Sequence, residues 1–286
     1  MNILVTGATG FVGRHLIPDL IEAEHQLICV VRDIDKARAL YNNKVSYVQA
    51  NDMHSILYYK PECCIHLASF LTSKNDENTS KQIVEANLVF GCELLNILKD
   101  CHSLKLFINF GSFAEYRMGP SQVNPAYLYS ATKTAFKQIV EYYADVTPFK
   151  HIHIIPYTIY GGIDTQKKVI DFLKSSLDAT VPIEMTKGEQ ILDFIHVMDV
   201  VLFINHIITH SDLFIKSPNI DYHLGTGKGT SIRALASMIE SKYRRKCNIK
   251  FGALPYRERD IMYAVAPIGR LIQMGWRPQR ELEDYI

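Results

Sequence analysis

The sequence lacks several features that would place it in a specialised class of protein. Its 286 residues carry 31 basic and 30 acidic side chains, a balance that gives no sign of binding to a nucleic acid or an anionic membrane. No apolar run reaches the roughly 18 residues that a membrane span needs. No charged segment followed by an apolar stretch precedes the first predicted strand. We therefore expect a soluble, cytoplasmic protein with no membrane partner.

Paired cysteines and metal motifs are also missing. The six cysteines show neither the spacing of a zinc site nor a disulfide framework, and several lie in apolar runs, so we interpret them as reduced core thiols. No His-x-His or His-Glu-x-x-His pattern stands near a carboxylate cluster, and we expect no metal. His66 and His196 lie in apolar segments and are interpreted as core residues rather than ligands.

What the sequence does contain is a regular alternation of short apolar runs with longer amphipathic stretches. Strands joined by helices form βαβ units, and their right-handed crossovers predict an α/β fold with a doubly wound parallel sheet. The predicted strands cover residues 3–5, 26–31, 45–49, 63–67, 106–110 and 152–156, and the helices between them cover 12–24, 34–41, 80–100 and 129–144.

A glycine-rich turn follows the first predicted strand directly, in the string Thr6-Gly7-Ala8-Thr9-Gly10-Phe11-Val12-Gly13. Gly7 permits a tight turn, Gly10 lets the backbone approach a ligand, and Gly13 lets the helix pack close to the strand. The helix then points free N–H groups and a partial positive charge at a phosphate. Glycine clusters also make ordinary turns, but the buried strand in front of this one favours a nucleotide cofactor.

The alternation loosens after about residue 160. Helices are predicted over 166–177, over 198–209 and over 231–243, with Ser231 as the N-cap of the last. We expect residues 1–162 to form a dinucleotide-binding domain to which 191–220 returns. Residues 163–190 and 221–286 are expected to form a smaller substrate lobe. Residues 280–286 look like the beginning of a helix, so we expect the native chain to be longer.

A tyrosine and a lysine stand four residues apart in Tyr129-Ser130-Ala131-Thr132-Lys133, and so share one face of a helix. A nearby ammonium lowers the pKa of a phenol, which makes such a pair a tuned proton donor and acceptor. Ser112 ends an apolar run at the carboxyl end of a predicted parallel strand, the edge at which open α/β sheets bind ligands. Taken singly, the pair is more often a surface pair and the serine more often a helix N-cap.

These motifs together resemble the extended short-chain dehydrogenase/reductases, a family of NAD(P)-dependent nucleotide-sugar epimerases, dehydratases and ketoreductases. The resemblance spans nearly the whole chain, including Asn87 and segments 193–200, 224–227, 257–260 and 275–278. It implies a Rossmann sheet with a smaller, mostly C-terminal substrate lobe.

The resemblance also implies roles for single residues. Ser112, Tyr129 and Lys133 match the family's catalytic set. Ser112, Thr158 and Arg257 match positions expected to meet the substrate, the arginine at its nucleotide phosphates. Residues expected to contact the cofactor are Gly7, Thr9, Gly10, Phe11, Val12, Gly13, Asp52, Met53, Leu67, Ala68, Ser69, Tyr129, Lys133, Pro156 and Ile159.

One departure from the family pattern concerns the cofactor. NAD users of the family carry an aspartate at the end of the second strand, where this chain has Val31 followed by Arg32. Without that carboxylate a 2′-phosphate is not repelled, and a guanidinium can bind it bidentately. We therefore expect Arg32 to contact NADP(H), with NAD(H) as the less favoured cofactor. The alternative is that Arg32 is solvated and Asp33 takes the acidic role one position late.

A second departure concerns the reaction. Family dehydratases carry an Asp-Glu pair after the catalytic hydroxyl, and this chain has Phe113 and Ala114 there. Neither side chain can move a proton, and Glu115 is expected to be turned away. The sequence therefore predicts NADPH-dependent reduction of a keto group, most plausibly at C4, on a nucleotide-activated 6-deoxy sugar.

Two alternatives to this function stay open at the level of the sequence. One is an NAD-retaining 4-epimerase that uses the same catalytic set, and the other is a catalytically silent dinucleotide sensor. The resemblance further implies a homodimer that pairs the helices near 80–100 and 129–144.

Overall fold

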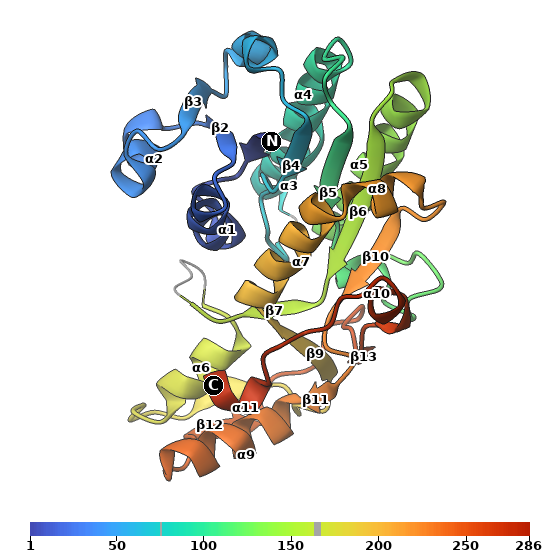
Figure 1. The fold of residues 1–286 in the computed structure, drawn as a ribbon. Coiled ribbons are helices and arrows are strands. Elements are labelled where there is room, and N and C mark those ends of the chain that lie inside the picture. The colour runs from blue at the N-terminus through green and yellow to red at the C-terminus, as the bar shows by residue number, and fades with distance from the viewer. Residues whose placement is uncertain (75, 163–166) are drawn as a thin grey trace.

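The computed structural model describes residues 1–74, 76–162 and 167–286. A parallel sheet with helices on both faces forms the larger part of the molecule (Figure 1). All six predicted strands are present, and the doubly wound α/β fold is confirmed. The sheet has the order β10-β6-β5-β4-β1-β2-β3. Its strands are β1 (Asn2–Thr6), β2 (Gln26–Val31), β3 (Ser46–Gln49), β4 (Cys63–His66), β5 (Leu106–Phe110), β6 (Lys150–Pro156) and β10 (Asp221–Leu224).

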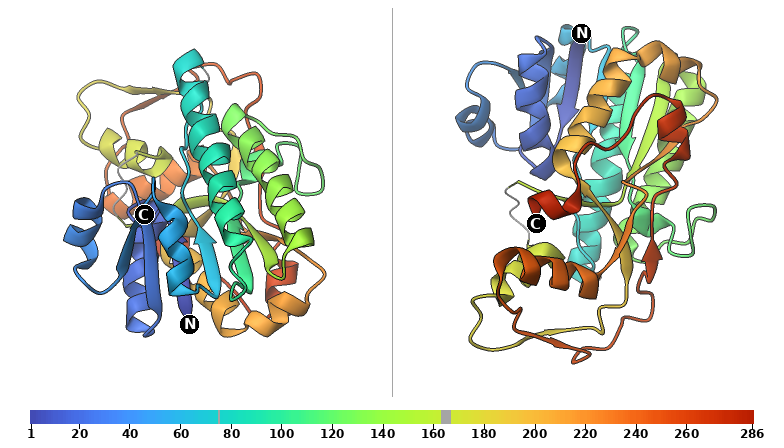
Figure 2. Two further views of the ribbon diagram at one scale, coloured as in Figure 1. Left: turned by 90° about the horizontal axis from the view of Figure 1, so that it is seen from above. Right: turned by 60° about the horizontal axis from the view of Figure 1, so that its bottom comes forward.

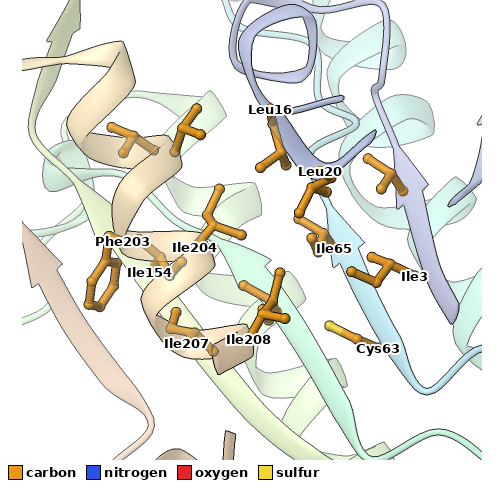
Figure 3. Close-up of a cluster of buried hydrophobic side chains, with 14 of the residues drawn as sticks. Ile3, Leu16, Leu20, Cys63, Ile65, Ile154, Phe203, Ile204, Ile207 and Ile208 are labelled. Atoms are coloured by element: carbon orange, nitrogen blue, oxygen red, sulfur yellow. The ribbon is translucent and has the colours of Figure 1, made fainter. Parts of the chain in front are cut away.

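One face of the sheet is covered by α1 (Phe11–Glu22) and α7 (Val197–Thr209), which lie side by side although they are far apart in sequence (Figure 3). Leu16 and Leu20 of α1 and Ile204 of α7 pack over strand residues such as Ile3 and Ile65, and all of them are buried. Because both faces of a doubly wound sheet are buried, its strands are apolar at successive positions rather than alternating. The helix α2 (Ile34–Tyr41) continues this layer.

The opposite face is covered by α4 (Phe90–Leu98) and α5 (Leu128–Val146), with the 3-10 segment η1 (Met53–Tyr59) beside them. The predicted helix over 80–100 is present as α3 (Glu77–Val84) and α4, joined by the π-helical segment η2 (Glu85–Val89). A π turn inserts one extra residue and often marks a functional position. Asn87 lies in this turn and is buried.

The smaller lobe is built from short strands and helices, and lies at one end of the molecule (Figure 2). A second sheet has the order β11 (Gly229–Ser231), β9 (Ile191–His196), β13 (Tyr263–Ala264), and β7 (Thr158–Tyr160) also pairs with β9. The strands β8 (Ile183–Met185) and β12 (Ile249–Phe251) form a separate pair. An apolar cluster joins the helices α6 (Val169–Ser176), α9 (Ile232–Tyr243) and α11 (Leu282–Tyr285).

The two lobes share the chain differently from the boundaries expected above. Residues 191–196 were expected to return to the dinucleotide-binding domain, and they form β9, which pairs with β7, β11 and β13 in the second sheet. Residues 221–286 were expected to lie in the smaller lobe, but β10 extends the main sheet beside β6. Leu271 of α10 (Gly269–Gln273) and Trp276 also pack on the main core, whereas the short helix α8 (Ser211–Lys216) leads into β10. Four-residue strands next to polar turns carry too little periodicity to be placed from sequence.

Two further observations concern burial. In the part of the chain that the structure describes, no helix is both long enough and apolar enough to cross a bilayer. Cys29, Cys63, Cys64 and Cys101 are buried free thiols, which confirms the interpretation of these cysteines as reduced core residues. Burial raises the pKa of the Cys29 thiol to about 12 and keeps it protonated.

A buried carboxylate holds the smaller sheet together and predicts a stability effect. Asp193 accepts hydrogen bonds from the backbone N–H groups of Thr226, Gly227 and Ala266 and from the Thr226 hydroxyl. In Asp193→Asn an amide NH2 would face these donors, and we expect the free energy of unfolding in urea to fall by about 2–3 kcal/mol. Asp178→Asn is the control, because the Asp178 side chain is 78% exposed and pairs only with Arg245 at the surface. An equal loss in both variants would contradict this account.

Candidate active site

The glycine turn after β1 lies against the end of β4. Gly7 has φ +70, and a Cβ there would stand 2.6 Å from the Ala68 nitrogen. A Cβ on Gly13 would stand 2.5 Å from the carbonyl oxygens of Gly7 and Ala8. Only glycine fits at both positions. The backbone of the turn therefore stays accessible at the start of α1, as it must be to bind a pyrophosphate. The residues present therefore fit a bound dinucleotide.

The adenosine end of such a cofactor would lie over the ends of β2 and β3. Arg32 follows β2 and is exposed, and its backbone carbonyl accepts a hydrogen bond from the Gln49 side chain at 2.8 Å. Asp33 is the N-cap of α2, where its carboxylate accepts the Lys36 N–H at 2.9 Å. This capping bond engages the Asp33 carboxylate, which was considered above as a replacement for the missing family aspartate. Asp52 is exposed, and the Met53 side chain beside it is buried.

Tyr129 and Lys133 lie together on the buried face of α5. The lysine Nζ stands 5.9 Å from the centre of the tyrosine ring, and Lys133 is 3% exposed and Tyr129 8% exposed. Phe136 and Val140, also buried, continue the same face and anchor the helix on the sheet. The four-residue spacing therefore brings the two groups together as predicted.

The expected effect of the lysine on the tyrosine pKa is not observed. Burial raises the pKa of Tyr129 to about 12, with a hydrogen bond to the Ser69 side chain opposing the shift. Burial also lowers the pKa of Lys133 to about 8, and the negative charge of Glu115 opposes that shift. Removing the groups from water disfavours both charged forms, and this desolvation outweighs the Ser69 hydrogen bond at Tyr129 and the charge of Glu115 at Lys133. The tyrosine is thus a neutral phenol near neutral pH, beside a lysine that is still mostly charged.

Ser112 stands at the end of β5, before the short 3-10 segment η3 (Phe113–Glu115). Its hydroxyl accepts the Ala114 N–H at 3.2 Å, so the N-cap interpretation applies, and its own proton can be donated elsewhere. Its backbone N–H donates to Glu115 Oε1 at 2.7 Å. The other carboxylate oxygen, Oε2, accepts the Thr134 hydroxyl of α5 at 2.8 Å. The carboxylate therefore connects the serine turn to the helix that carries the tyrosine and the lysine.

Asn87 connects the end of β4 to the same helix. Its side-chain oxygen accepts the Phe70 N–H at 2.7 Å and the Ser69 hydroxyl at 3.2 Å. Its NH2 donates to the Thr132 hydroxyl at 3.1 Å. The end of the segment of Leu67 to Ser69, predicted to contact the cofactor, is thereby fixed beside α5.

The end of β6 and strand β7 form the next wall. Pro156 is buried, whereas Thr158 and Ile159 are partly buried on β7. The Ile159 carbonyl accepts a hydrogen bond from Lys168 Nζ at 3.0 Å, and this ammonium stands 3.9 Å from the centre of the Phe11 ring. Lys168 therefore contacts both Phe11 and Ile159, two residues that were predicted to contact the cofactor.

The smaller lobe reaches the start of α5 through Arg257. Its guanidinium stands 5.8 Å from the ring of Tyr127, two residues before Tyr129, and Tyr127 donates to Asp260 at 3.4 Å. Arg259 donates to the Asn124 side chain and the Pro125 carbonyl, both at 2.8 Å. Arg257 is exposed and lies beside the start of α5.

Two residues of this region were not identified as contributors from the sequence. Glu115 was expected to be turned away, and its carboxylate does face α5, but it also holds the backbone of Ser112. The signal was available, because Ser112-x-x-Glu115 is a capping box. His153 of β6 stands 3.9 Å from Glu115 Oε1 and is buried, and nothing in its apolar strand pattern indicates this contact.

His66 and His196 are buried, as predicted. His66 shares a hydrogen bond with the Thr6 hydroxyl and lies among aromatic rings, and burial lowers its pKa to about 3. His196 caps α7 by accepting the Met198 N–H. Within the described residues, no three His, Cys, Asp or Glu side chains gather into a metal cluster.

Fold and site together define a dinucleotide-binding α/β protein with a serine, a tyrosine and a lysine at the carboxyl edge of its sheet. Residues 3–225 match the NAD dependent epimerase/dehydratase family, and the chain belongs to this family. The resemblance drawn from the sequence is thereby confirmed.

Curated relatives align along nearly their whole length. The CDP-abequose synthase of Salmonella typhimurium is 28% identical, over 96% of this chain and 93% of its own. The dTDP-6-deoxy-L-talose 4-dehydrogenase (NAD(+)) of Aggregatibacter actinomycetemcomitans is 22% identical, over 92% and 98%. The dTDP-4-dehydro-6-deoxyglucose reductase of Escherichia coli is 24% identical, over 100% and 95%.

Solved structures share the fold. The UDP-glucose 4-epimerase of Thermus thermophilus in complex with NAD aligns with a TM-score of 0.82 at 20% identity, over 100% of this chain and 96% of that one. At this identity the likeness concerns the fold.

The close approach at Gly13 predicts the effect of one added methyl group. Gly13→Ala forces the first turn of α1 away from the glycine turn, and we expect the affinity for NADPH to fall about tenfold or more, since overpacking costs about 1–3 kcal/mol. Titration of the nicotinamide fluorescence measures it. Gly269→Ala is the matched control, because a Cβ there meets nothing within 4 Å. Unchanged binding by a folded Gly13→Ala protein would rule out this cradle.

Proposed function

We propose that this protein reduces the C4 keto group of a nucleotide-activated 6-deoxy sugar with NADPH. The observation that carries the proposal is the buried pair of Tyr129 and Lys133 beside a serine turn that offers no further proton-transfer side chain to the sugar. Curated relatives named as a 4-dehydrogenase and a reductase of dTDP-6-deoxy sugars support the substrate class.

The residues take the following roles in this proposal. The Gly7–Gly13 turn, Arg32 and Lys133 hold the cofactor, which when bound supplies the hydride. Ser112 donates its free proton to the keto oxygen and polarises it. Tyr129 protonates the oxygen as negative charge develops there, and its raised pKa keeps the phenol loaded with that proton near neutral pH. Arg257 contacts the nucleotide diphosphate from the smaller lobe.

The walls beside Ser112 favour reduction over dehydration. Phe113 stacks on Tyr157 with ring centres 5.7 Å apart, and Ala114 is buried in the same apolar cluster. Removal of water from a sugar needs an acid and a base near the departing groups, and neither side chain supplies one. Glu115, the nearest carboxylate in sequence, is 1% exposed and bonded to Ser112 and Thr134.

The activity can be measured directly. We expect the purified protein to consume NADPH with a 4-keto-6-deoxy sugar linked to CDP, dTDP, UDP or GDP, followed by the absorbance of the reduced nicotinamide. Tyr129→Phe keeps the ring and removes the acidic proton, so kcat should fall about 100-fold or more. Tyr142→Phe is the matched control, because Tyr142 is 63% exposed. No consumption with any of these ketones, or full activity of Tyr129→Phe, would refute the proposal.

The second candidate function is an NAD-retaining 4-epimerase, favoured by the fold shared with the NAD-bound epimerase of Thermus thermophilus. It predicts cofactor that co-purifies with the protein and inversion at C4 without net oxidation of added NADPH. A silent dinucleotide sensor predicts binding without either reaction. The homodimer stays a prediction.

The choice of NADPH depends on Arg32. The name of one relative specifies NAD(+), so the 2′-phosphate preference needs its own test. We expect Arg32→Gln to weaken NADPH binding about 10- to 100-fold and to leave NADH binding unchanged, since a charge-assisted hydrogen bond contributes about 1.5–3 kcal/mol. Arg38→Gln is the control, because the Arg38 guanidinium stands over the Tyr47 ring. An unaltered NADPH-to-NADH affinity ratio would assign Arg32 to the solvated surface.

A further inference from the structure

The proposed mechanism leaves the buried acid beside Ser112 without a role. Glu115 is 1% exposed, and both of its carboxylate oxygens accept hydrogen bonds, one from the Ser112 backbone and one from the Thr134 hydroxyl. The backbone bond is 2.7 Å long, and the residue that donates it carries the hydroxyl expected to meet the keto oxygen. Burying a carboxylate costs solvation free energy, and hydrogen bonds offset only part of that cost.

The ionisable groups that face Glu115 come from two neighbouring elements, β6 and α5. His153 of β6 points Nε2 at Oε1 from 3.9 Å, and its other nitrogen bonds to Asn109 of β5 at 3.2 Å. From α5, the positive charges of Lys133 and Lys137 act on the carboxylate.

Each of these neighbours has a definite charge state. His153 stays neutral, because burial lowers its pKa well below the usual value. Lys137 is held by Asp221 of β10 at 2.8 Å. Lys133 is the cation whose pKa responds to Glu115, since the carboxylate raises it.

We propose that Glu115 is a positioning residue, which in its ionised form fixes the Ser112 turn against α5 and keeps Lys133 charged. This inference rests on the reduction proposed above. Glu115 has no direct part in proton transfer to the sugar, because its oxygens are occupied by Ser112 and Thr134. Protonation would turn one oxygen into a donor facing another donor, and so would loosen the bond to Ser112 or to Thr134.

The inference has a kinetic signature. Burial raises the pKa of Glu115 to about 7, so we expect kcat of the wild type to fall as the pH drops through about 7. It should also fall as the pH rises through the pKa of Lys133, about 8. In Glu115→Gln the fall of kcat at low pH (the acid limb of the profile) should vanish. The fall at high pH (the alkaline limb) should begin at lower pH, because the negative charge that raises the pKa of Lys133 is gone. At its optimum we expect kcat to be about tenfold lower with KM nearly unchanged, since the serine is misplaced but binding groups remain.

A second variant separates this role from simple packing. The Thr134 hydrogen bond lowers the pKa of Glu115, so Thr134→Val should move the acid limb to higher pH without removing it. Asp199→Asn is the matched control, because Asp199 is also a fully buried carboxylate that accepts hydrogen bonds, here from Arg280 and Gln279. It should lower stability and leave both limbs in place. Identical pH profiles for wild type and Glu115→Gln would overturn the inference.

An unfolding experiment decides the matter without a substrate. The folded-state pKa of Glu115 lies above its unfolded value of 4.5, so the folded protein binds the proton more tightly. The contribution of Glu115 to the free energy of unfolding must then fall as the pH rises from about 4.5 to about 7. Glutamine at this position removes that contribution.

The stability of Glu115→Gln in urea, relative to wild type, should therefore increase across that window. A difference independent of pH would overturn the inference. Absence of turnover in the wild type, together with this titration, would instead refute the proposed reduction alone.

Discussion

The candidate site depends on how the first turns of α5 are buried. Tyr129, Ser130, Thr132 and Lys133 are polar, yet all are buried against the sheet, while Phe136 and Val140 supply the apolar anchor further along. Polar groups taken out of water must find partners. They find them in segments distant in sequence, such as Asn87 in the π turn and Ser69 after β4. The same contacts that satisfy the helix therefore assemble the site.

Burial also determines the charge states at this site. It pushes tyrosine, lysine and glutamate toward their neutral forms, and the three groups respond to different degrees. Tyr129 stays a phenol, Lys133 is near the point of losing its proton, and Glu115 is near the point of gaining one. A phenol that keeps its proton suits a reaction in which an alkoxide must be protonated, and a charged lysine beside it stabilises the negative oxygen as it forms. The expectation that the lysine lowers the tyrosine pKa considered proximity and omitted desolvation.

The cofactor half of the molecule was largely predictable from the sequence, for a physical reason. Strands buried on both faces are apolar runs, and the turn that follows β1 needs glycine at Gly7 and Gly13 because backbone atoms occupy the space of a side chain. Both signals are local. The strand β10 and the second sheet escaped prediction because their strands are short and their pairing is between distant segments, as in β9 with β11 and β13. The role of Glu115 was predictable only in part. Its capping-box spacing to Ser112 is a local signal, but its hydrogen bond to Thr134 joins distant segments.

The two halves meet through an apolar cluster, which joins Ala114 and Ala126 to Ala264, and through polar contacts beside it. Arg259 holds the Asn124–Pro125 segment, which follows the serine turn and leads directly into α5. Arg257 stands over Tyr127 at the beginning of that helix. Both contacts join the smaller lobe to the stretch of chain between Ser112 and Tyr129.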